Sequence, residues 1–391
     1  MTSPVNTAPV WALSTHAKEL NQLLQGQSAQ PGPRAALLCI DHKEAAALLG
    51  LDSLDTRDAV EQAASTLRTR VCKAVVIIGS KNENYADTPQ AIGRLSLPAG
   101  HLAVDSSAFA ASAADALAKG FVAIDAIILA SMATANAQPG TAFSRHSGNL
   151  PYFSLPQPTP VSGFAPLSDP DLGVYAVVDS AAWVERVVIA GVRTVQLRIK
   201  DAQQPEQREF VRQQVRRAIA AATTAGAQLF INDHWQLAIE EGAYGVHLGQ
   251  EDLHIADLDA IQKAGLRLGI STHAYWEVCR AWALQPSYIA CGPIHPTQAK
   301  VMPWIPQGND NLAYWCALLP TPVVGIAGMD VPRTEQAARA GAAGVAVISA
   351  ITAAPSPEAA IVQLQEAMQR GRKSLPITAP LFPKPTLLPT P

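Results

Sequence analysis

The chain has 391 residues, roughly two to three times the usual length of a single domain, so we expect two domains. Its formal net charge is −3 and 16% of its residues are charged, below the roughly 25% of an average soluble protein. Such a chain lacks the broad basic surface that binds a nucleic-acid backbone. Residues 122–137 form the longest apolar stretch, but they contain Asp125 and Asn136 and fall short of the roughly 20 apolar residues that cross a bilayer. Residues 1–10 lack signal-peptide features, so we expect a cytoplasmic protein with no membrane and no nucleic-acid partner.

Cysteine and proline indicate how the chain is organised. The five cysteines form no CxxC pair, which argues against a disulfide framework and against a structural zinc site. Of the 30 prolines, seven lie in 139–170 and six in 376–391, a composition typical of a linker and a tail. We therefore expect an N-terminal extension (1–34), an Ala-rich domain (35–138), a Pro-rich linker (139–171), a larger domain (172–370) and a Pro-rich tail (371–391).

In the larger domain, short β-branched and apolar runs alternate with helical stretches, the pattern of βα units and a parallel sheet. The expected strands are 174–179, 194–198, 228–231, 245–248, 267–270, 288–291, 322–326 and 344–348. Helices are expected at 205–225 and 235–241, the latter followed by Gly242 as a C-terminal cap. Eight such units predict an α/β fold with a (β/α)8 barrel, and a doubly wound sheet is the alternative.

Polar residues follow these expected strands, where a barrel of this kind carries its chemistry. The last two strands are the usual phosphate position, and Gly325, Gly328, Ile348 and Ser349 lie there. An ordinary βα turn is the alternative for those glycines. The cations Arg198, Lys200 and Lys300 exceed what one monophosphate needs and indicate a more highly charged group such as a diphosphate, although each alone is more often a solvated surface cation.

Carboxylates and histidines occupy the same expected rim. Asp233 and Asp252 follow neighbouring strands and could hold one Mg²⁺, which proteins bind through one or two carboxylates plus phosphate oxygens. A pair of helix N-caps is the alternative. His247 and His273 are candidates for acid–base work, although a histidine in a strand is more often packed in the core. From the residues alone, the rim suits two phosphorylated ligands with Mg²⁺.

Seven motifs follow one another along the larger domain. They are Gln196-Leu-Arg-Ile-Lys-Asp201, Phe230-Ile-Asn-Asp233, Gly245-Val-His-Leu-Gly-Gln-Glu-Asp252, Gly269-Ile-Ser-Thr-His273, Gly292-Pro-Ile-His-Pro-Thr297, Gly325-Ile-Ala-Gly328 and Val347-Ile-Ser-Ala350. With these motifs, residues from about 172 to 369 resemble thiamine phosphate synthase. The resemblance implies a (β/α)8 transferase that joins hydroxymethylpyrimidine diphosphate to thiazole phosphate, giving thiamine phosphate and pyrophosphate. Pyrophosphate would leave first, and the thiazole nitrogen would capture a pyrimidine cation.

The resemblance also implies roles for individual residues. Gln196 would contact the pyrimidine, and Mg²⁺ would be held by Asp233 and Asp252. The diphosphate would be bound by Arg198, Lys200, Asn232, Ser271 and Lys300, and the thiazole phosphate by Thr297, Gly328, Ile348 and Ser349. The family usually has a hydroxyl residue before the lysine that follows Pro-Thr, and here that position is Ala299. We therefore expect a reduced affinity for thiazole phosphate, which Ala299→Thr should improve.

Four segments of the Ala-rich domain carry a second, weaker resemblance: 39–50, 73–79, 104–109 and 116–120. They resemble the C-terminal half of hydroxymethylpyrimidine phosphate kinase of the ribokinase-like group, with Asp41 where that family has Asn and Ser107 where it has a catalytic Cys or Asp. This implies a degenerate domain without kinase activity that acts as a dimerisation or stabilising module, or that retains binding of a pyrimidine or nucleotide. Alternative functions for the whole chain are a thiazole tautomerase-like barrel centred on His273, a noncatalytic thiamine phosphate-binding protein and a bifunctional kinase–synthase. The sequence leaves open whether the protein forms a homo-oligomer.

Overall fold

The computed structural model describes residues 9–25, 35–79, 83–96, 105–135, 147–155, 162–200, 205–297, 303–380 and 383–388. The chain forms two compact units. The first comprises Met1–Pro156, Ala274–Ala283 and Pro385–Pro391, and the second comprises Gln157–His273 and Leu284–Lys384. None of the helices in the described ranges has the length and apolar character that a bilayer crossing requires.

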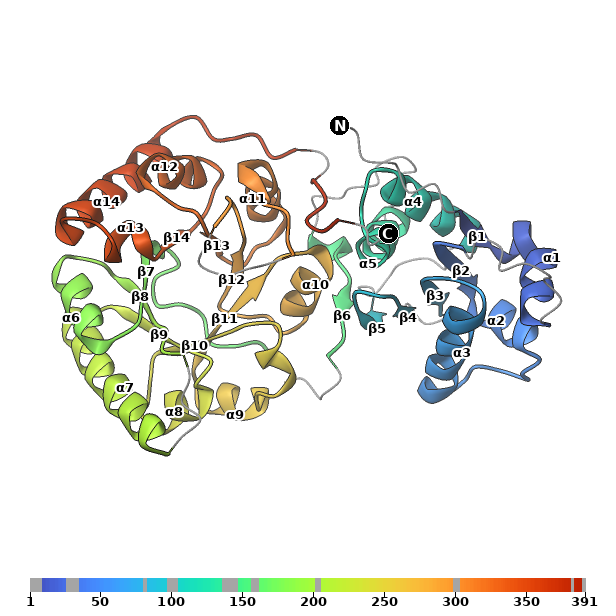
Figure 1. The fold of residues 1–391 in the computed structure, drawn as a ribbon, viewed down its shortest axis with the longest axis horizontal. Coiled ribbons are helices and arrows are strands. Elements are labelled where there is room, and N and C mark those ends of the chain that lie inside the picture. Colours follow the sequence, from blue (N-terminus) through green and yellow to red (C-terminus); the bar gives the residue numbers. More distant parts are fainter. Residues whose placement is uncertain are drawn as a thin grey trace. The chain divides into compact units, whose positions relative to one another are not determined.

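The first unit is built on a six-stranded mixed sheet with the order β1-β2-β3-β4-β5-β6 (Figure 1). Its strands are β1 (Val10–Ala12), β2 (Leu37–Asp41), β3 (Val75–Ile78), β4 (Glu83–Asp87), β5 (Ile92–Ser96) and β6 (Tyr152–Phe153). The first three strands pair in parallel and the later ones antiparallel. The helices of this unit are α1 (Leu13–Leu24), α2 (His42–Leu49), α3 (Arg57–Arg70), α4 (Ser106–Ala118), α5 (Ala123–Ala135), the 3₁₀ turn η1 (Ser147–Asn149) and α10 (Tyr275–Ala283).

Local sequence explains how α2 begins. Asp41 ends β2 and caps the helix, since its Oδ1 accepts hydrogen bonds from the backbone N–H groups of Lys43 and Glu44, both at 2.8 Å. The Glu44 carboxylate in turn accepts from the backbone N–H of Asp41 at 3.1 Å, which completes a capping box. Asp41 and Glu44 therefore have a structural role in starting this helix.

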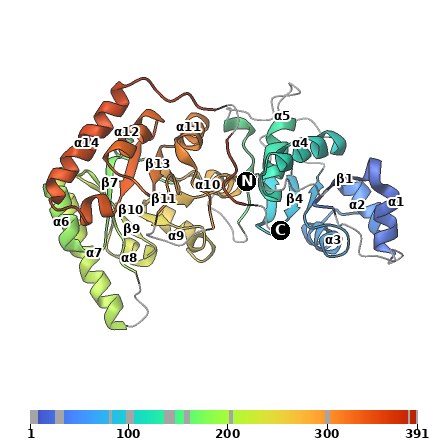
Figure 2. The ribbon, with the colours of Figure 1, turned by 45° about the horizontal axis from the view of Figure 1, so that its top comes forward.

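The second unit is a closed parallel barrel with the strand order β10-β11-β12-β13-β14-β7-β8-β9 (Figure 1 and Figure 2). Its strands are β7 (Gly173–Val178), β8 (Thr194–Leu197), β9 (Gln228–Asn232), β10 (Gly245–Leu248), β11 (Arg267–Thr272), β12 (Tyr288–Cys291), β13 (Val323–Ile326) and β14 (Gly344–Val347). Pairing of β14 with β7, with Val345 opposite Val174, closes the ring. All eight expected strands are confirmed, and the alternative of an open, doubly wound sheet is wrong.

Helices follow the barrel strands and lie outside the ring (Figure 1). They are α6 (Ala181–Ile189), α7 (Pro205–Ala225), α8 (Trp235–Glu240), η2 (Asp252–His254), α9 (Leu258–Lys263), α11 (Gly308–Leu318), α12 (Val331–Arg339), α13 (Ser349–Thr352) and α14 (Pro357–Lys373). The expected helices at 205–225 and 235–241 are confirmed. Gly242, which follows the C-cap residue Glu241 of α8, adopts φ 67°, the left-handed conformation expected after a helix C-terminus.

Aromatic rings fill part of the barrel interior. Tyr175, Phe230 and Tyr288 are fully buried, with ring centroids 5.0–6.0 Å apart. A Cβ atom on Gly269 would lie 2.1 Å from Cζ of Tyr288, so the glycine in β11 leaves the space that this ring occupies. Two of the three rings carry hydroxyl groups, which brings polar atoms deep into an otherwise apolar core.

Candidate active site

The carboxyl ends of β8, β9 and β11 bring three polar side chains to the barrel rim. Gln196 lies in β8, Asn232 ends β9, and Ser271 lies in β11. Gln196 and Asn232 are buried, whereas Ser271 is half-buried. Because β8, β9, β10 and β11 are consecutive neighbours in the ring, these side chains belong to one arc of the rim.

Two carboxylates meet on this arc. Asp233 follows β9 with φ 62°, and its Oδ2 accepts a hydrogen bond from Nδ2 of Asn232 at 2.5 Å. Asp252 begins η2, and its Oδ2 accepts from the backbone N–H of Gly249 at 3.1 Å. Burial and the neighbouring carboxylate of Asp252 raise the pKa of Asp233 to about 6. Two carboxylates in contact repel each other, so a hard divalent cation suits this pair.

The helix-cap alternative fails for Asp233. Helix α8 has His234 as its N-cap residue, with no side-chain hydrogen bond to the helix, and the Asp233 side chain is engaged by Asn232. Asp233 has a positive φ, and its carboxylate contacts Asn232 and the carboxylate of Asp252 instead of the helix. Asp233 is therefore free of a capping role.

Of the three expected cations, the structure brings Arg198 to the carboxylates. Arg198 follows β8, its backbone N–H donates to the carbonyl oxygen of Val178 at 2.7 Å, and its positive charge partly offsets the raised pKa of Asp233. Lys200 is exposed and is the last described residue after β8. Lys300 and Ala299 lie outside the described residues.

The loops after β12 and β13 pack tightly together. The backbone N–H of His295 donates to the carbonyl oxygen of Ala327 at 3.2 Å. Gly328 has φ 66°, and a Cβ atom there would lie 2.6 Å from the carbonyl oxygen of Pro296, so only glycine fits. Thr297 directly follows this contact, which places it beside Gly328.

The other residues predicted to bind a phosphate lie in two different parts of the barrel. Ile348 precedes α13 and Ser349 begins it, after β14, as expected of a barrel phosphate site. Gly325 lies within β13, where a Cβ atom would be 3.1 Å from Cδ2 of Leu312. The lack of a side chain at Gly325 thus allows close packing against α11.

The two candidate histidines differ in environment. Burial, and secondarily the charge of Arg198, lowers the pKa of His247 to about 3, so this imidazole is neutral. A neutral imidazole with such a low pKa cannot act as a general acid near pH 7. The ring of His273 stacks on Trp304, with centroids 5.2 Å apart.

Sequence reasoning missed Tyr175 and Tyr288. The Tyr175 hydroxyl accepts from Nε2 of Gln196 at 3.2 Å and lies 2.7 Å from the Tyr288 hydroxyl. The Tyr288 hydroxyl lies 2.7 Å from Nδ1 of His247, whose Nε2 lies 2.8 Å from Oγ of Ser271. The available signal was a tyrosine within each of two otherwise apolar strands, since a buried hydroxyl needs a partner.

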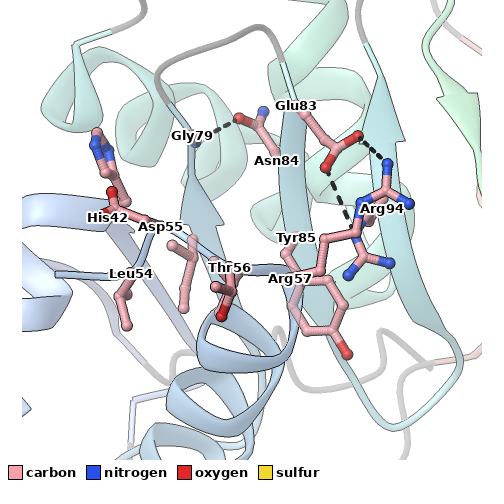
Figure 3. Close-up of a pocket in the computed structure, with 12 residues that line it drawn as sticks. His42, Leu54, Asp55, Thr56, Arg57, Gly79, Glu83, Asn84, Tyr85 and Arg94 are labelled. Atoms are coloured by element: carbon pink, nitrogen blue, oxygen red, sulfur yellow. Dashed lines mark hydrogen bonds and ion pairs between the residues drawn. The ribbon is translucent and has the colours of Figure 1, made fainter.

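A cavity of about 190 Å³ lies in the first unit, beside β3, β4 and the start of α3 (Figure 3). The Glu83 carboxylate lies between Arg57, at 3.7 Å, and Arg94, at 3.4 Å (Figure 3). Arg94 also pairs with Glu61. The positive charges of both arginines are matched by carboxylates of the protein, which does not favour a phosphate site.

Comparison with known proteins gives matches over the barrel. The family model described as thiamine monophosphate synthase matches residues 174–351. The thiamine-phosphate synthase of Serratia proteamaculans (strain 568) is 51% identical over 205 residues, covering 52% of this chain and 95% of that protein. The thiamine-phosphate synthase of Salmonella newport (strain SL254) is 53% identical over 194 residues, covering 49% of this chain and 90% of that protein. A solved thiamine phosphate pyrophosphorylase from Pyrococcus furiosus is 25% identical with a TM-score of 0.46, covering 52% of this chain and 98% of that one.

Proposed function

Because the chain belongs to the thiamine-phosphate synthase family, a family of transferases, we propose that its barrel joins hydroxymethylpyrimidine diphosphate to thiazole phosphate. The products are thiamine phosphate and pyrophosphate. The observation that carries this proposal is the contact between Asp233 and Asp252, beside Arg198, at the barrel rim. A leaving diphosphate needs such a combination of cation and metal-binding carboxylates.

The pyrimidine diphosphate would occupy the arc formed by β8 to β11. Gln196 contacts the pyrimidine, while Arg198 and Asn232 bind the diphosphate, with Ser271 as a hydroxyl donor at its far side. Lys200 and Lys300 complete the cation set. Asp233 and Asp252 would hold Mg²⁺, which when bound would neutralise negative charge on the diphosphate.

These residues would act by stabilising charge. The bond between the pyrimidine methylene carbon and the diphosphate oxygen breaks, and the oxygen keeps the electron pair. Arg198 directly follows β8, where its backbone N–H donates to the carbonyl oxygen of Val178 at 2.7 Å, and its positive charge would stabilise the charge that grows on the diphosphate oxygen. The thiazole nitrogen then donates its lone pair to the methylene carbon, and no general base is needed. The low pKa of His247 agrees with a site that does not rely on acid–base exchange.

The thiazole phosphate would bind where the loops after β12, β13 and β14 meet. Thr297 and Gly328 lie on one side, and Ile348 and Ser349 lie at the start of α13. Backbone N–H groups at such a position suit a phosphate. The paired carboxylates favour this synthase over a tautomerase-like barrel, because isomerising a thiazole phosphate releases no diphosphate.

The test is to incubate the purified full chain with both phosphorylated substrates and Mg²⁺, and to measure thiamine phosphate and pyrophosphate. We expect both products in equal amounts. Omission of Mg²⁺, or of either substrate, is the control and should abolish the signal. A wild-type protein that forms no product under these conditions would refute the proposal.

We further propose that the first unit is a degenerate ribokinase-like module that stabilises the chain. Two observations support this role. The segment that resembles a kinase motif is used as a helix capping box by Asp41 and Glu44, and the arginines of the cavity are neutralised by Glu83 and Glu61. We propose the domain boundaries 35–138 and 172–370, joined by a Pro-rich linker, with 1–34 and 371–391 as an extension and a tail.

A further inference from the structure

Five side chains form one continuous hydrogen-bonded chain across the barrel interior. It runs from Gln196 through Tyr175, Tyr288 and His247 to Ser271, with successive distances of 3.2, 2.7, 2.7 and 2.8 Å. The three central residues are at most 6% exposed. A buried hydroxyl or imidazole that loses its partner carries a large energetic cost, so every link of this chain must be made.

The central groups can be satisfied only as a set. Burial keeps His247 neutral and both tyrosines protonated, so the imidazole has one N–H donor and one acceptor nitrogen. Each tyrosine hydroxyl has one proton to donate. Because each link needs one donor and one acceptor, the direction chosen at one end fixes the direction of every other link.

In the first direction, the amide N–H of Gln196 donates to Tyr175, which donates to Tyr288, which donates to Nδ1 of His247. The N–H at Nε2 of His247 then donates to Oγ of Ser271. The hydroxyl proton of Ser271 is then free to bind a ligand. The side-chain carbonyl oxygen of Gln196 points away from Tyr175. Gln196 then accepts from a ligand, while Ser271 donates to one.

In the second direction, Ser271 donates to Nε2 of His247, and the N–H at Nδ1 donates to Tyr288. Tyr288 donates to Tyr175, which must donate to the carbonyl oxygen of Gln196, so the amide is flipped. Gln196 now offers N–H groups to a ligand. If the amide kept its first orientation, the buried proton of Tyr175 would have no acceptor along this chain.

We propose that this chain is a specificity relay, in which an anion bound at Ser271 makes Gln196 a hydrogen-bond acceptor that selects a pyrimidine carrying an amino group over one carrying an oxo group. The inference rests on the proposed function, which places the diphosphate at Ser271 and the pyrimidine at Gln196. A phosphate oxygen only accepts, so Ser271 must donate to it, and the first direction follows. Tyr175, Tyr288 and His247 are positioning residues in this relay.

The relay can be tested by binding, without turnover. Calorimetry on the full-length protein would measure the affinities of the aminopyrimidine alcohol and of its oxo analogue, each with and without Mg²⁺ and pyrophosphate. We expect pyrophosphate to raise the ratio of amino to oxo affinity by about tenfold in wild type, because the two sites are thermodynamically linked. An unchanged ratio in wild type would overturn the proposal.

Variants separate the relay from direct contact between the two ligands. Tyr288→Phe cuts the chain at its centre, because the Tyr288 hydroxyl contacts Tyr175, His247 and the Gln196 side chain. His247→Phe cuts the chain beside Ser271. In either folded variant, pyrophosphate should no longer change the ratio, whereas Tyr314→Phe, a buried tyrosine of α11 outside the chain, should behave as wild type. Retention of the pyrophosphate effect in either relay variant would also overturn the proposal. Product formation by wild type, measured separately, tells failure of the relay from failure of the synthase function.

Discussion

A Cβ atom on Gly269 would lie 2.1 Å from Cζ and 2.3 Å from Oη of Tyr288. The glycine in β11 thus decides where the Tyr288 ring lies, and with it the hydrogen bonds of that hydroxyl to Tyr175 and His247. We expect Gly269→Ala to lower the stability of the protein by about 1–3 kcal/mol, the usual cost of overpacking a core. We also expect it to reduce synthase activity, because the ring must move. Chemical denaturation and steady-state kinetics would measure the two effects.

The clash can be removed without restoring the hydrogen bonds of Tyr288. The double variant Gly269→Ala/Tyr288→Leu lacks the ring atoms that the new methyl group would meet. We expect this variant to regain part of the stability relative to the sum of the single variants, but not the activity. Additive losses of stability would show that the ring of Tyr288 is not what Gly269 accommodates.

The carboxylate pair gives a prediction with two readouts. In Asp233→Asn or Asp252→Asn, we expect the synthase rate to fall by orders of magnitude, because the leaving diphosphate loses its metal site. In buffer without Mg²⁺, removal of one charge relieves the repulsion that helps raise the pKa of Asp233, so the thermal midpoint should not fall.

Addition of Mg²⁺ and pyrophosphate should raise the thermal midpoint of wild type by mass action, and should do so much less in either variant. Asp259→Asn, an exposed change on α9, is the matched control and should behave as wild type. Equal stabilisation of wild type and both Asn variants would show that this pair does not hold the metal.

The sequence predicted the barrel well because each strand is a local β-branched run between helical stretches. Closure was not predictable from spacing, since it depends on pairing between β7 and β14, about 170 residues apart in the chain. The location of the rim residues was also predictable, because these residues lie at or just after the ends of the expected strands. The roles of Tyr175 and Tyr288 were not predictable. A tyrosine in an apolar strand is expected to be an ordinary core residue, and only the structure shows that these two hydroxyls lie next to each other.

Helix α10 shows another limit of sequence reasoning. It follows β11 along the chain, as a barrel helix should, yet it packs against β6 and α5 of the first unit. Trp276 and Val278 are buried there, and the Arg280 guanidinium lies 5.3 Å from the ring centroid of Phe153. Nothing in the α10 sequence distinguishes these partners from a neighbouring barrel helix.

Deletion of residues 1–165 should therefore uncover α10. We expect the shortened chain to bind more of a hydrophobic dye, to unfold at a lower temperature and to aggregate, because large apolar side chains lose their cover. The full chain carrying Phe153→Ala is a milder version and should shift the same measurements in the same direction. A shortened chain with the wild-type thermal midpoint and synthase rate would leave no stabilising role for the first unit.

Asp125 in α5 makes the stability of the first unit depend on pH. Its Oδ1 accepts a hydrogen bond from the backbone N–H of Trp276 at 3.2 Å, and burial raises its pKa from 3.8 to about 8. Folding therefore takes up a proton in this range. The stabilisation is fully present below pH 3.8, is lost progressively as the pH rises to about 8, and then changes no further.

Asp125→Asn keeps an acceptor for Trp276 but cannot ionise. We expect its thermal midpoint to fall less than that of wild type between pH 5 and pH 9, so that the variant is the more stable protein at the higher pH. The carboxylate of Glu277 also faces Asp125 and contributes to the raised pKa, and burial together with Asp125 raises the pKa of Cys279. Glu277→Gln and Cys279→Ala are therefore the matched variants, and each should retain most of the wild-type fall. An equal fall in wild type and Asp125→Asn would show that another group controls the pH dependence.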